Sequence, residues 1–339
     1  MVQHIVFGAG LIGSYLGAIM QLQGLSVTLI GRQNMLDKLK DGITLTDYHQ
    51  HRQQVRMTGL YDIYRSPNAI LPTADFLWLT VKCTGIQHAL IDIQLLVTPQ
   101  TVILCCQNGL GSDQQVKQAF PNNAVLRVMV PFNVVQFENG HFHRGSEGAL
   151  TIEHDESTIA NELQALLACE LLPVRCDSDM HNLLWAKLQL NLGNAVNAIA
   201  DIPVKAMLRQ RNFRRVIATM MEELLAVVRA QDIKLPRITA VSADKLPMIL
   251  RLPDWLFVLV ANKMLAIDPD VRTSMWWDLH QHKQTEIDYL NGEIVKWGVK
   301  LAIPTPVNSA VVQWIKAIES EDMVQGVSGQ DMLVRLNIG

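Results

Sequence analysis

A short apolar segment followed by a glycine-rich turn opens the chain, and this feature constrains the fold most strongly. Residues 3–7 read QHIVF, a strand-like run, and residues 8–13 read GAGLIG, which is the pattern G-x-G-x-x-G. An apolar helix-like stretch (14–22) and a second strand-like run (25–30) follow. In such a strand–turn–helix–strand unit, the glycines permit a tight turn and a close backbone approach to a pyrophosphate, while the N–H groups at the start of the helix face the phosphates.

This opening therefore predicts a dinucleotide-binding βαβ unit, with a merely structural turn as the alternative. The predicted cofactor contacts are the residues of the turn, Gly8, Ala9, Gly10, Leu11, Ile12 and Gly13.

The end of the second strand-like run indicates which dinucleotide binds. NAD sites usually carry Asp or Glu about 20 residues beyond the glycines, where it meets the ribose hydroxyls. This chain has Gly31 and Arg32 there instead. Without a carboxylate a 2′-phosphate is not repelled, and a guanidinium can bind it bidentately. The sequence predicts NADP(H) as the cofactor, and a solvated loop arginine is the alternative.

Polar residues also follow two later strand-like runs. Lys82 comes after FLWLTV, and Asn108 comes after TVILCCQ. Ligands of open α/β sheets lie at the carboxyl ends of the strands. We therefore expect Lys82 and Asn108 to contact the cofactor, unless they only begin loops.

The order of apolar runs predicts an α/β fold in two domains. Strand-like runs at 76–81, 101–107, 125–130 and 149–153 alternate with helix-like segments, which indicates a doubly wound, mostly parallel sheet. After Asp179 the periodicity is helical, and the clearest helix is expected from Thr285 to Leu301. We predict a Rossmann-type domain over residues 1–178 and an all-α substrate and catalytic domain over residues 179–339.

One expected helix, over residues 183–200, carries an unusual polar stripe. Its only formal charge is Lys187, and Asn191 and Asn194 fall on the same helical face. The rest of the segment is largely apolar. Because a buried charge is costly without a partner or a purpose, Lys187 is a candidate functional residue, with a solvated lysine as the alternative.

Composition and charge disfavour nucleic acid and membranes as partners of this chain. The 339 residues leave room for two domains, and a net charge of −3 disfavours nucleic acid or an anionic membrane. The most apolar stretch, residues 255–267, is too short to span a bilayer and contains Lys263. The chain begins at once with the strand and glycine turn, so we expect no signal peptide and a cytoplasmic protein.

The cysteines and a histidine pair give no metal or disulfide signal. Five cysteines without C-x-x-C spacing predict free thiols, and Cys105 and Cys106 should point to opposite faces of a strand. His141 and His143 form H-x-H near two glycines, for which a polar hairpin is favoured over a metal site. No metal is predicted.

With these pieces in hand, the chain resembles the ketopantoate reductase (2-dehydropantoate 2-reductase) family. The matching segments are GAGLIGSYLGA, TVKCTG, QNGLG, LLWAKLQLN, SMWWDLHQHKQTEIDYLNG and AIPTPVN, in the family's order. The resemblance implies an NADPH-binding Rossmann domain joined to a helical domain, with the active site in the cleft between them. It also implies a 2-oxo acid as substrate.

The resemblance assigns roles to individual residues. Lys187 matches the catalytic lysine and Glu286 the active-site glutamate. Asn191 and Ser274 match substrate contacts, and Asn194 is carried over as the second substrate asparagine. Lys82, Asn108 and Arg32 match residues on the cofactor side.

Three departures from the family pattern stand out. The asparagines follow Lys187 by four and seven residues instead of four and eight, which makes Asn197 a competitor of Asn194. A further substrate asparagine of some members has no equivalent near Pro203. The segment 240–269 looks longer than in compact members of the family. A longer segment there would change the mouth of the pocket or an interface, and so concerns the identity of the substrate more than the reaction type.

The implied reaction is hydride transfer from NADPH to the ketone carbon of 2-dehydropantoate, a step of pantothenate biosynthesis. Lys187 would protonate the carbonyl oxygen: burial should lower its pKa toward neutrality while Glu286 holds its charged form. Glu286 could equally be a carboxylate in the first turn of a helix, and Ser274 a helix cap.

Other functions also fit the residues. One is an NADPH reductase of another 2-oxo acid, including an opine-type dehydrogenase that joins an oxo acid to an amine. Another is a catalytically silent NADP(H)-binding sensor. The apolar segment near Trp255 is compatible with a homodimer.

Overall fold

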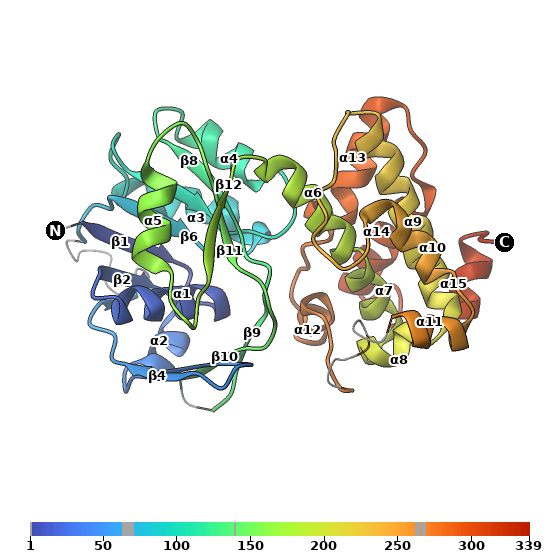
Figure 1. The fold of residues 1–339 in the computed structure, drawn as a ribbon, viewed down its shortest axis with the longest axis horizontal. Helices are drawn as coiled ribbons and strands as arrows, with labels where there is room; N and C mark the ends of the chain where they lie inside the picture. Colours follow the sequence, from blue (N-terminus) through green and yellow to red (C-terminus); the bar gives the residue numbers. More distant parts are fainter. Residues whose placement is uncertain (1, 63–70, 139, 262–264, 266–268) are drawn as a thin grey trace. The chain divides into compact units, whose positions relative to one another are not determined.

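The computed structural model describes residues 2–62, 71–138, 140–261, 265 and 269–339 (Figure 1). The chain divides into two compact units, residues 1–180 and 181–339. Each unit has its own core, and each is described here by itself.

The first unit is built on an eight-stranded sheet. Its strands, in spatial order, are β12 (Val174–Asp177), β11 (Leu150–Glu153), β8 (Val125–Met129), β7 (Val102–Cys105), β6 (Phe76–Leu79), β1 (Gln3–Phe7), β2 (Ser26–Ile30) and β5 (Leu60–Tyr61). Neighbouring strands from β8 to β5 run parallel, and the pair β11 and β8 is antiparallel. The mostly parallel, doubly wound sheet predicted from the sequence is confirmed.

The strand order reverses direction at β1. From β1 the chain passes to β2 on one side and later returns to β6 on the other side. In open α/β sheets such a switch point is where a crevice forms outside the carboxyl ends of the strands. The carboxyl ends of β7, β6, β1 and β2 therefore lie next to one another at one edge of the sheet.

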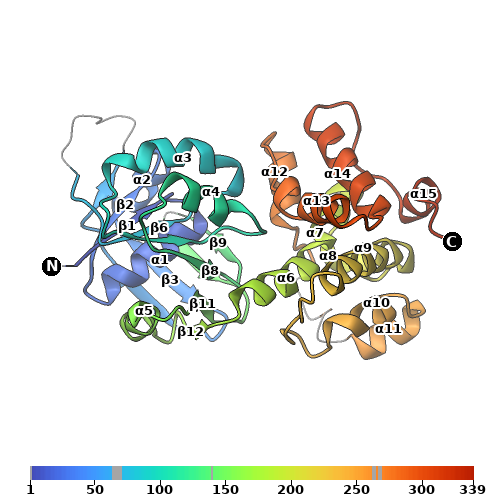
Figure 2. The same cartoon turned by 90° about the horizontal axis from the view of Figure 1, so that it is seen from above.

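Helices cover both faces of this sheet (Figure 2). On one face, α1 (Leu11–Leu22) and α5 (Ile159–Leu167) pack with alternate strand residues such as Val6 and Leu104. On the other face, α3 (Ile86–Asp92) and α4 (Ser112–Ala119) pack with the intervening residues, among them Ile5. Successive side chains of each strand thus enter different cores.

The free thiols of the chain follow this alternation. All five cysteines are free, and Cys83 and Cys105 are buried. Cys105 belongs to the core under α3, while Cys106 packs against the core under α1. The prediction that these two neighbours point to opposite faces is confirmed.

A second, smaller sheet was not predicted from the sequence. It contains, in order, β4 (Arg52–Val55), β3 (Ile43–Asp47), β10 (His141–Arg144) and β9 (Val134–Gln136), and α2 (Gln33–Leu39) precedes β3. Strands β9 and β10 form the polar hairpin expected for His141 and His143. Both imidazole rings are hydrogen-bonded to the hydroxyl of Thr46, at 2.8 and 2.9 Å.

A buried histidine in β1 makes the stability of this unit depend on pH. His4 is 0% exposed, its Nδ1 accepts a 3.2 Å hydrogen bond from Nε1 of Trp78, and its ring stacks on Phe76. Burial lowers the pKa of His4 to about 4, against a weaker opposing effect of Asp75. The neutral ring is therefore the form that fits the fold.

We expect the His4→Gln variant to lose less stability in acid than the wild-type protein. Because the folded-state pKa lies below the unfolded one, the stabilisation is complete above the unfolded pKa and is lost as pH falls toward 4. Between pH 7.5 and 5 the wild type should lose about 2 kcal/mol more unfolding free energy than the variant. Urea unfolding at the two pH values measures this, and equal losses would exclude His4 as the cause.

Helices are the regular secondary structure among the described residues of the second unit, and non-helical segments connect them. Its α-helices are α6 (Met180–Asn191, which begins at the last residue of the first unit), α7 (Gly193–Ala200), α8 (Val204–Leu208), α9 (Arg211–Arg229), α10 (Leu246–Leu250), α11 (Asp254–Val260), α12 (Ser274–His280), α13 (Asn291–Leu301), α14 (Pro306–Glu319) and α15 (Gly329–Arg335). Short 3₁₀ turns span Ala243–Lys245 and Ile287–Tyr289. The long central helix α9 contacts α7, α10, α13, α14 and α15.

Two helices predicted from the sequence are interrupted, which corrects the expected boundaries. The segment 183–200 is divided into α6 and α7 at Leu192, just before Gly193, a poor helix former. Leu192 keeps helical dihedral angles of −59° and −31°, so only the hydrogen-bond ladder is broken there. The helix expected from Thr285 begins instead at Asn291, because Leu290 has φ −108° and ψ −101°.

A buried polar network joins α9, α13 and α14. The Glu223 carboxylate accepts hydrogen bonds from the backbone N–H groups of Val307 and Asn308, at 2.8 and 2.9 Å, and so caps α14. The side chain of Asn291, at the start of α13, donates to Oδ1 of Asn308 at 3.0 Å. Burial raises the pKa of Glu223 although these bonds favour its charged form. This network fixes the helices that follow Glu286.

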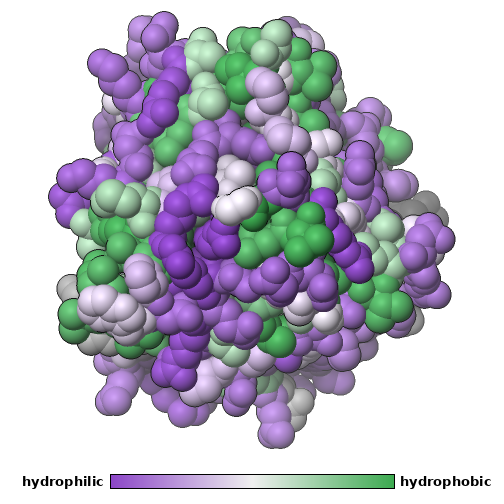
Figure 3. Space-filling view, turned by 90° about the vertical axis from the view of Figure 1, so that its right-hand side faces the viewer, coloured by the Kyte–Doolittle hydropathy of each residue, from purple (hydrophilic) through white to green (hydrophobic). Residues whose placement is uncertain are grey.

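The surface of the second unit carries several exposed apolar side chains. Trp255 and Leu259 on α11 are 72% and 73% exposed. On the face drawn in Figure 3, hydrophobic areas are separated from one another by hydrophilic residues. Of the apolar segment 255–267, residues 262–264, including Lys263, and residues 266 and 267 lie outside the described residues. None of the helices described is both long and apolar enough to cross a bilayer.

Candidate active site

The glycine turn leads from β1 directly into α1. Gly8 has φ +115°, a conformation that favours glycine, and its N–H and that of Ala9 donate to the carbonyl of Ile30 at the end of β2, at 3.0 and 2.9 Å. Gly10 is the N-cap of α1, and no side chain caps this end. A Cβ built on Gly10 would meet nothing within 4 Å, so the backbone there borders open space.

Two other glycines close the turn onto the sheet. A Cβ on Gly13 would lie 2.0 Å from the carbonyl oxygen of Gly8 and 2.5 Å from Oγ1 of Thr80. A Cβ on Gly31 would lie 2.3 Å from the Cβ of Ala9. Gly13 thus allows α1 to approach the sheet, and Gly31 allows the end of β2 to approach the turn. This packing role of Gly31 was not predicted from the sequence.

Arg32 lies at the end of β2, beside the glycine turn. It is exposed and is the N-cap of α2, and its guanidinium makes no hydrogen bond or ion pair to the described residues. The N–H of Gly31 donates to the carbonyl of Tyr61 at 3.1 Å, so that β5 and the following residue, Asp62, are neighbours of this edge. The position of Asp62 near the end of β2 was not predicted from the sequence, because Asp62 is distant along the chain from Arg32 and the glycine turn.

Lys82 and Asn108 lie at the carboxyl ends of the adjacent strands β6 and β7. Both residues are exposed, and both interact with neighbouring groups. The thiol of Cys83, next to Lys82, donates to the carbonyl of Asn108 at 2.9 Å, which ties the two loops together. The structure therefore brings the glycine turn, Arg32, Lys82 and Asn108 to one edge of one sheet.

In the second unit, Lys187 is placed midway along α6. The side chain of Lys187 is half-buried, while its neighbours Trp185, Ala186 and Leu188 are buried. Gln189 is also buried and donates to the carbonyl of Ala243 at 2.9 Å. Lys187 itself has an interaction partner. Lys187 is thus a half-buried residue whose immediate neighbours along the helix are buried.

The asparagines after Lys187 differ sharply in their surroundings. Asn191 ends α6 and Asn194 lies in the first turn of α7, and both are half-buried. Asn197 is fully buried: its Nδ2 donates to the carbonyl of Ile202 at 2.6 Å, and its Oδ1 accepts from the N–H and hydroxyl of Thr273. Its hydrogen-bonding groups are already engaged by the protein, which favours Asn194 over Asn197 as a ligand contact.

Ser274 is the first residue of α12 and is exposed. The helix is capped by Thr273, whose hydroxyl accepts from the N–H of Trp276, so the capping role considered for Ser274 belongs to its neighbour. The hydroxyl of Thr273 donates its one hydrogen to Oδ1 of Asn197 at 3.0 Å, and its oxygen also lies 3.4 Å from the carbonyl oxygen of Asn194. Thr273 therefore holds Ser274 beside the start of α7.

Glu286 is the N-cap residue of the short 3₁₀ turn Ile287–Tyr289, which precedes α13. Its side chain is buried, with the residue 8% exposed, and it interacts with other groups. Because α13 begins five residues later, Glu286 is outside the first turn of that helix, and Glu293 is the acidic residue there. The helix-dipole interpretation of Glu286 is therefore wrong.

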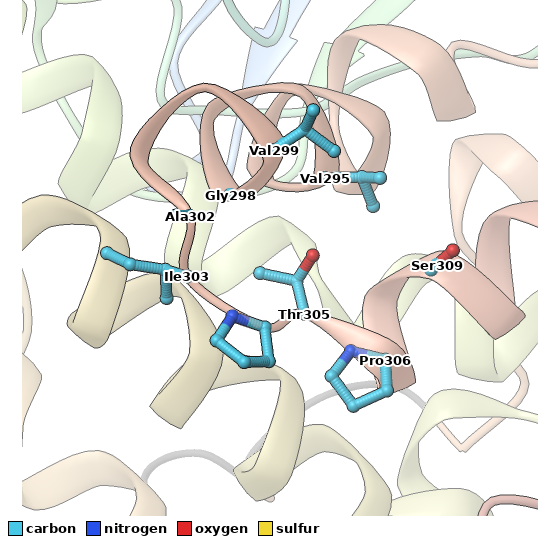
Figure 4. Close-up of a pocket in the computed structure, with 9 residues that line it drawn as sticks. Val295, Gly298, Val299, Ala302, Ile303, Thr305, Pro306 and Ser309 are labelled. Carbon is cyan, nitrogen blue, oxygen red and sulfur yellow. The ribbon is translucent and has the colours of Figure 1, made fainter.

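A depression of about 490 Å³ opens where α13 ends and α14 begins (Figure 4). Apolar side chains dominate it, including Val295, Val299 and Ile303, and Thr305 and Ser309 also line it. None of the site residues predicted from the sequence lines it. We assign it no part in the candidate site.

Comparison with known protein families agrees with this arrangement. Residues 4–156 match the model "Ketopantoate reductase PanE/ApbA", and residues 179–319 match "Ketopantoate reductase PanE/ApbA C terminal". The chain belongs to the ketopantoate reductase family. It is thus an oxidoreductase of that family, with a Rossmann-like first unit and a helical second unit.

Individual relatives of the ketopantoate reductase family are similar over nearly the whole chain. A 2-dehydropantoate 2-reductase of Vibrio cholerae is 26% identical, with 93% of this chain and 97% of the relative covered. A solved PanE/ApbA family ketopantoate reductase from Ralstonia eutropha JMP134 has a TM-score of 0.78 at 27% identity, covering 94% of this chain and 99% of that one.

A dehydrogenase with another substrate shares the fold. The structure of D-mandelate dehydrogenase with NADH and anilino(oxo)acetate has a TM-score of 0.76 at 20% identity and covers 94% of this chain and 99% of that one. The ketopantoate reductase fold therefore extends to other dehydrogenases.

Proposed function

We propose that this protein reduces 2-dehydropantoate to pantoate with NADPH, in pantothenate biosynthesis. The family membership supports the reaction class, and one structural observation supports the cofactor. The carboxyl ends of β1, β2, β6 and β7 converge on one edge of the sheet, where the uncapped start of α1 borders open space at Gly10. In this proposal the first unit binds NADPH and the second unit binds the 2-oxo acid.

The residues at this edge fit a dinucleotide. A side chain on Gly10 would fill the space that the backbone leaves open, and Gly8 and Gly13 tolerate no side chain for reasons of conformation and packing. The N–H groups of Leu11, Ile12 and Gly13 in the first turn of α1 would bind the pyrophosphate. Lys82 and Asn108 would contact the cofactor from the ends of β6 and β7. When bound, NADPH supplies the hydride that reduces the ketone carbon.

The second unit supplies the proton and the substrate contacts. As the ketone carbon gains hydride, the Lys187 ammonium donates a proton to the carbonyl oxygen, which becomes the hydroxyl of the product. The Glu286 carboxylate orients Lys187 and holds its charged form until the transfer. Asn191, Asn194 and Ser274 donate neutral hydrogen bonds to the substrate's carboxylate and hydroxyl groups. Lys187 then regains its proton from solvent.

An absorbance assay at the NADPH band tests the proposal. The rate with 2-dehydropantoate should exceed the rates with other 2-oxo acids, including phenyl-substituted ones, measured with and without added amines. A higher rate with another acid would assign this chain to that substrate, and a rate that requires an amine would indicate an opine-type dehydrogenase. NADPH binding without turnover of any oxo acid would favour the silent sensor.

NADH is the specific alternative to NADPH as the coenzyme of this protein. The mandelate dehydrogenase neighbour binds it, and Asp62 follows a strand that is paired with the end of β2. A carboxylate near this edge is the kind of group that meets ribose hydroxyls in NAD sites. The exposed guanidinium of Arg32 favours NADPH, because it is available for a 2′-phosphate.

We expect Arg32→Ala to weaken NADPH binding about 10- to 100-fold while NADH binding changes less than about twofold. A charge-assisted hydrogen bond to a phosphate contributes roughly 1.5–3 kcal/mol, which corresponds to that range. Fluorescence titration of the two dinucleotides measures the two dissociation constants. Equal weakening of both would contradict the assignment of Arg32 to the 2′-phosphate.

Two further expectations stay proposals. The exposed Trp255 and Leu259 on α11 support a homodimer, because exposed apolar groups of this size favour burial against a partner. A cytoplasmic location is expected from the sequence.

A further inference from the structure

Gln107 lies at the carboxyl end of β7, next to Asn108, and was not singled out from the sequence. The residue is buried, with 7% exposed. Its side-chain Nε2 donates to the backbone carbonyls of Leu79 and Val81, at 2.7 and 3.1 Å. One amide group thus holds two carbonyls at the end of the adjacent strand β6.

The orientation of this amide follows from its partners. Two carbonyl oxygens can be satisfied only by the NH₂ group, so Oε1 must point the other way. There Oε1 is buried, and no hydrogen-bond donor among the described residues reaches it. The two donated hydrogen bonds therefore fix both the position and the orientation of this amide.

The segment that Gln107 holds is in direct contact with the glycine turn. The hydroxyl of Thr80 donates to the carbonyl of Gly8 at 2.8 Å. The backbone nitrogen of Val81 lies 2.8 Å from the position that a Cβ on Gly8 would occupy. Lys82 is the next residue. The contacts therefore run from Gln107 through Val81 to Gly8.

We propose that Gln107 is a positioning residue for the dinucleotide: it holds the end of β6 against the glycine turn and thereby sets cofactor affinity. This inference rests on the proposed function, since it requires that the turn binds a dinucleotide. Gln107 acts through the backbone of residues 79–82, so it should affect NADP⁺ and NAD⁺ alike, in contrast to Arg32.

The test is the pH dependence of NADP⁺ affinity in Gln107→Glu. Above neutral pH the ionised carboxylate would face two carbonyl oxygens and push the end of β6 away, whereas the protonated acid donates one hydrogen bond. We expect the dissociation constant, measured by calorimetry, to exceed the wild-type value at least tenfold at pH 8 and by about threefold or less at pH 5.5. Taking the ratio to wild type at each pH removes the titration of the ligand phosphate.

Two further variants separate positioning from general loss of structure. The methionine of Gln107→Met is uncharged and has no hydrogen-bond donor, so this variant should weaken the binding of NADP⁺ and NAD⁺ equally at both pH values. It replaces Gln107→Glu as the test if Gln107→Glu does not fold. The matched control is Gln164→Glu, because Nε2 of Gln164 also donates to a strand carbonyl, that of Val174 in the edge strand β12, at 3.2 Å. This control should bind NADP⁺ as the wild type does.

Each remaining outcome would overturn the inference. Wild-type NADP⁺ affinity in both Gln107 variants would show that the hydrogen bonds from Gln107 to the carbonyls of Leu79 and Val81 do not matter for dinucleotide binding. A similar loss in Gln164→Glu, with no recovery at pH 5.5 in Gln107→Glu, would indicate general destabilisation of the unit. If the wild-type protein bound neither dinucleotide, the proposed function itself would fail, and the role of Gln107 with it.

Discussion

Replacing Lys187 by alanine should lower kcat by roughly 10²–10⁴, the range for loss of a general acid, while NADPH affinity stays within about twofold of wild type. Hydride arrival builds negative charge on the carbonyl oxygen, and without the ammonium that charge must be protonated by water. Lys187 is half-buried on a helix whose neighbouring residues are packed, so the truncation should leave the fold intact. Steady-state rates and a separate NADPH titration measure the two effects.

Two control variants make this result specific to proton donation. Lys300→Ala removes one positive charge from an exposed position of the same unit and should leave kcat unchanged. Lys187→Arg keeps the charge but does not release a proton near neutral pH, so it should be nearly as slow as the alanine variant. Turnover close to wild type in Lys187→Ala would remove the proposed mechanism.

The sequence predicted the parts of the fold that are encoded by local periodicity. Strand β1 was placed correctly, and the helix after the glycine turn was predicted with its correct end, because apolar runs and glycines there follow one another without interruption. That helix was expected from residue 14 but begins at Leu11, inside the segment assigned to the turn. Strand β4 was missed because its Arg52, Gln53 and Gln54 are exposed on a sheet edge and give no apolar alternation. The break at Leu290 depends on the non-helical dihedral angles of one residue, and the interruption at Leu192 leaves the dihedral angles helical. The apolar periodicity records neither.

The candidate site was predictable only in part for a related reason. Sequence patterns located residues at the ends of strands, and the parallel order β7, β6, β1, β2 then made them neighbours. Asn197 and Asn194 could not be distinguished from spacing, since only the contacts with Thr273 and Ile202 show that Asn197 is engaged. Gln107 carries no sequence signal, because its role arises from carbonyls of a strand distant along the chain.

The glycine turn gives the second large expected effect, in which two alanine substitutions have opposite consequences. Gly13→Ala should destabilise the first unit by about 2 kcal/mol or more, because its Cβ would lie 2.0 Å from the backbone oxygen of Gly8 and the turn must shift. Gly10→Ala should leave stability unchanged or slightly raised, because Gly10 has φ −78° and ψ −166°, which any residue adopts, and its Cβ would meet no atom within 4 Å.

Gly10→Ala, which should not destabilise the protein, should instead weaken the binding of NADPH. The Cβ of Gly10→Ala would enter the space through which the backbone approaches a pyrophosphate, so NADPH affinity should fall at least about tenfold, or about 1.4 kcal/mol, in a protein of normal thermal stability. Thermal unfolding without ligand and an NADPH titration of each variant measure the two effects separately. Wild-type affinity in Gly10→Ala would mean that the open space beside the turn does not receive the phosphates, and the start of α1 would lose its place in the site. Wild-type stability in Gly13→Ala would instead show that α1 can move away from the sheet without cost.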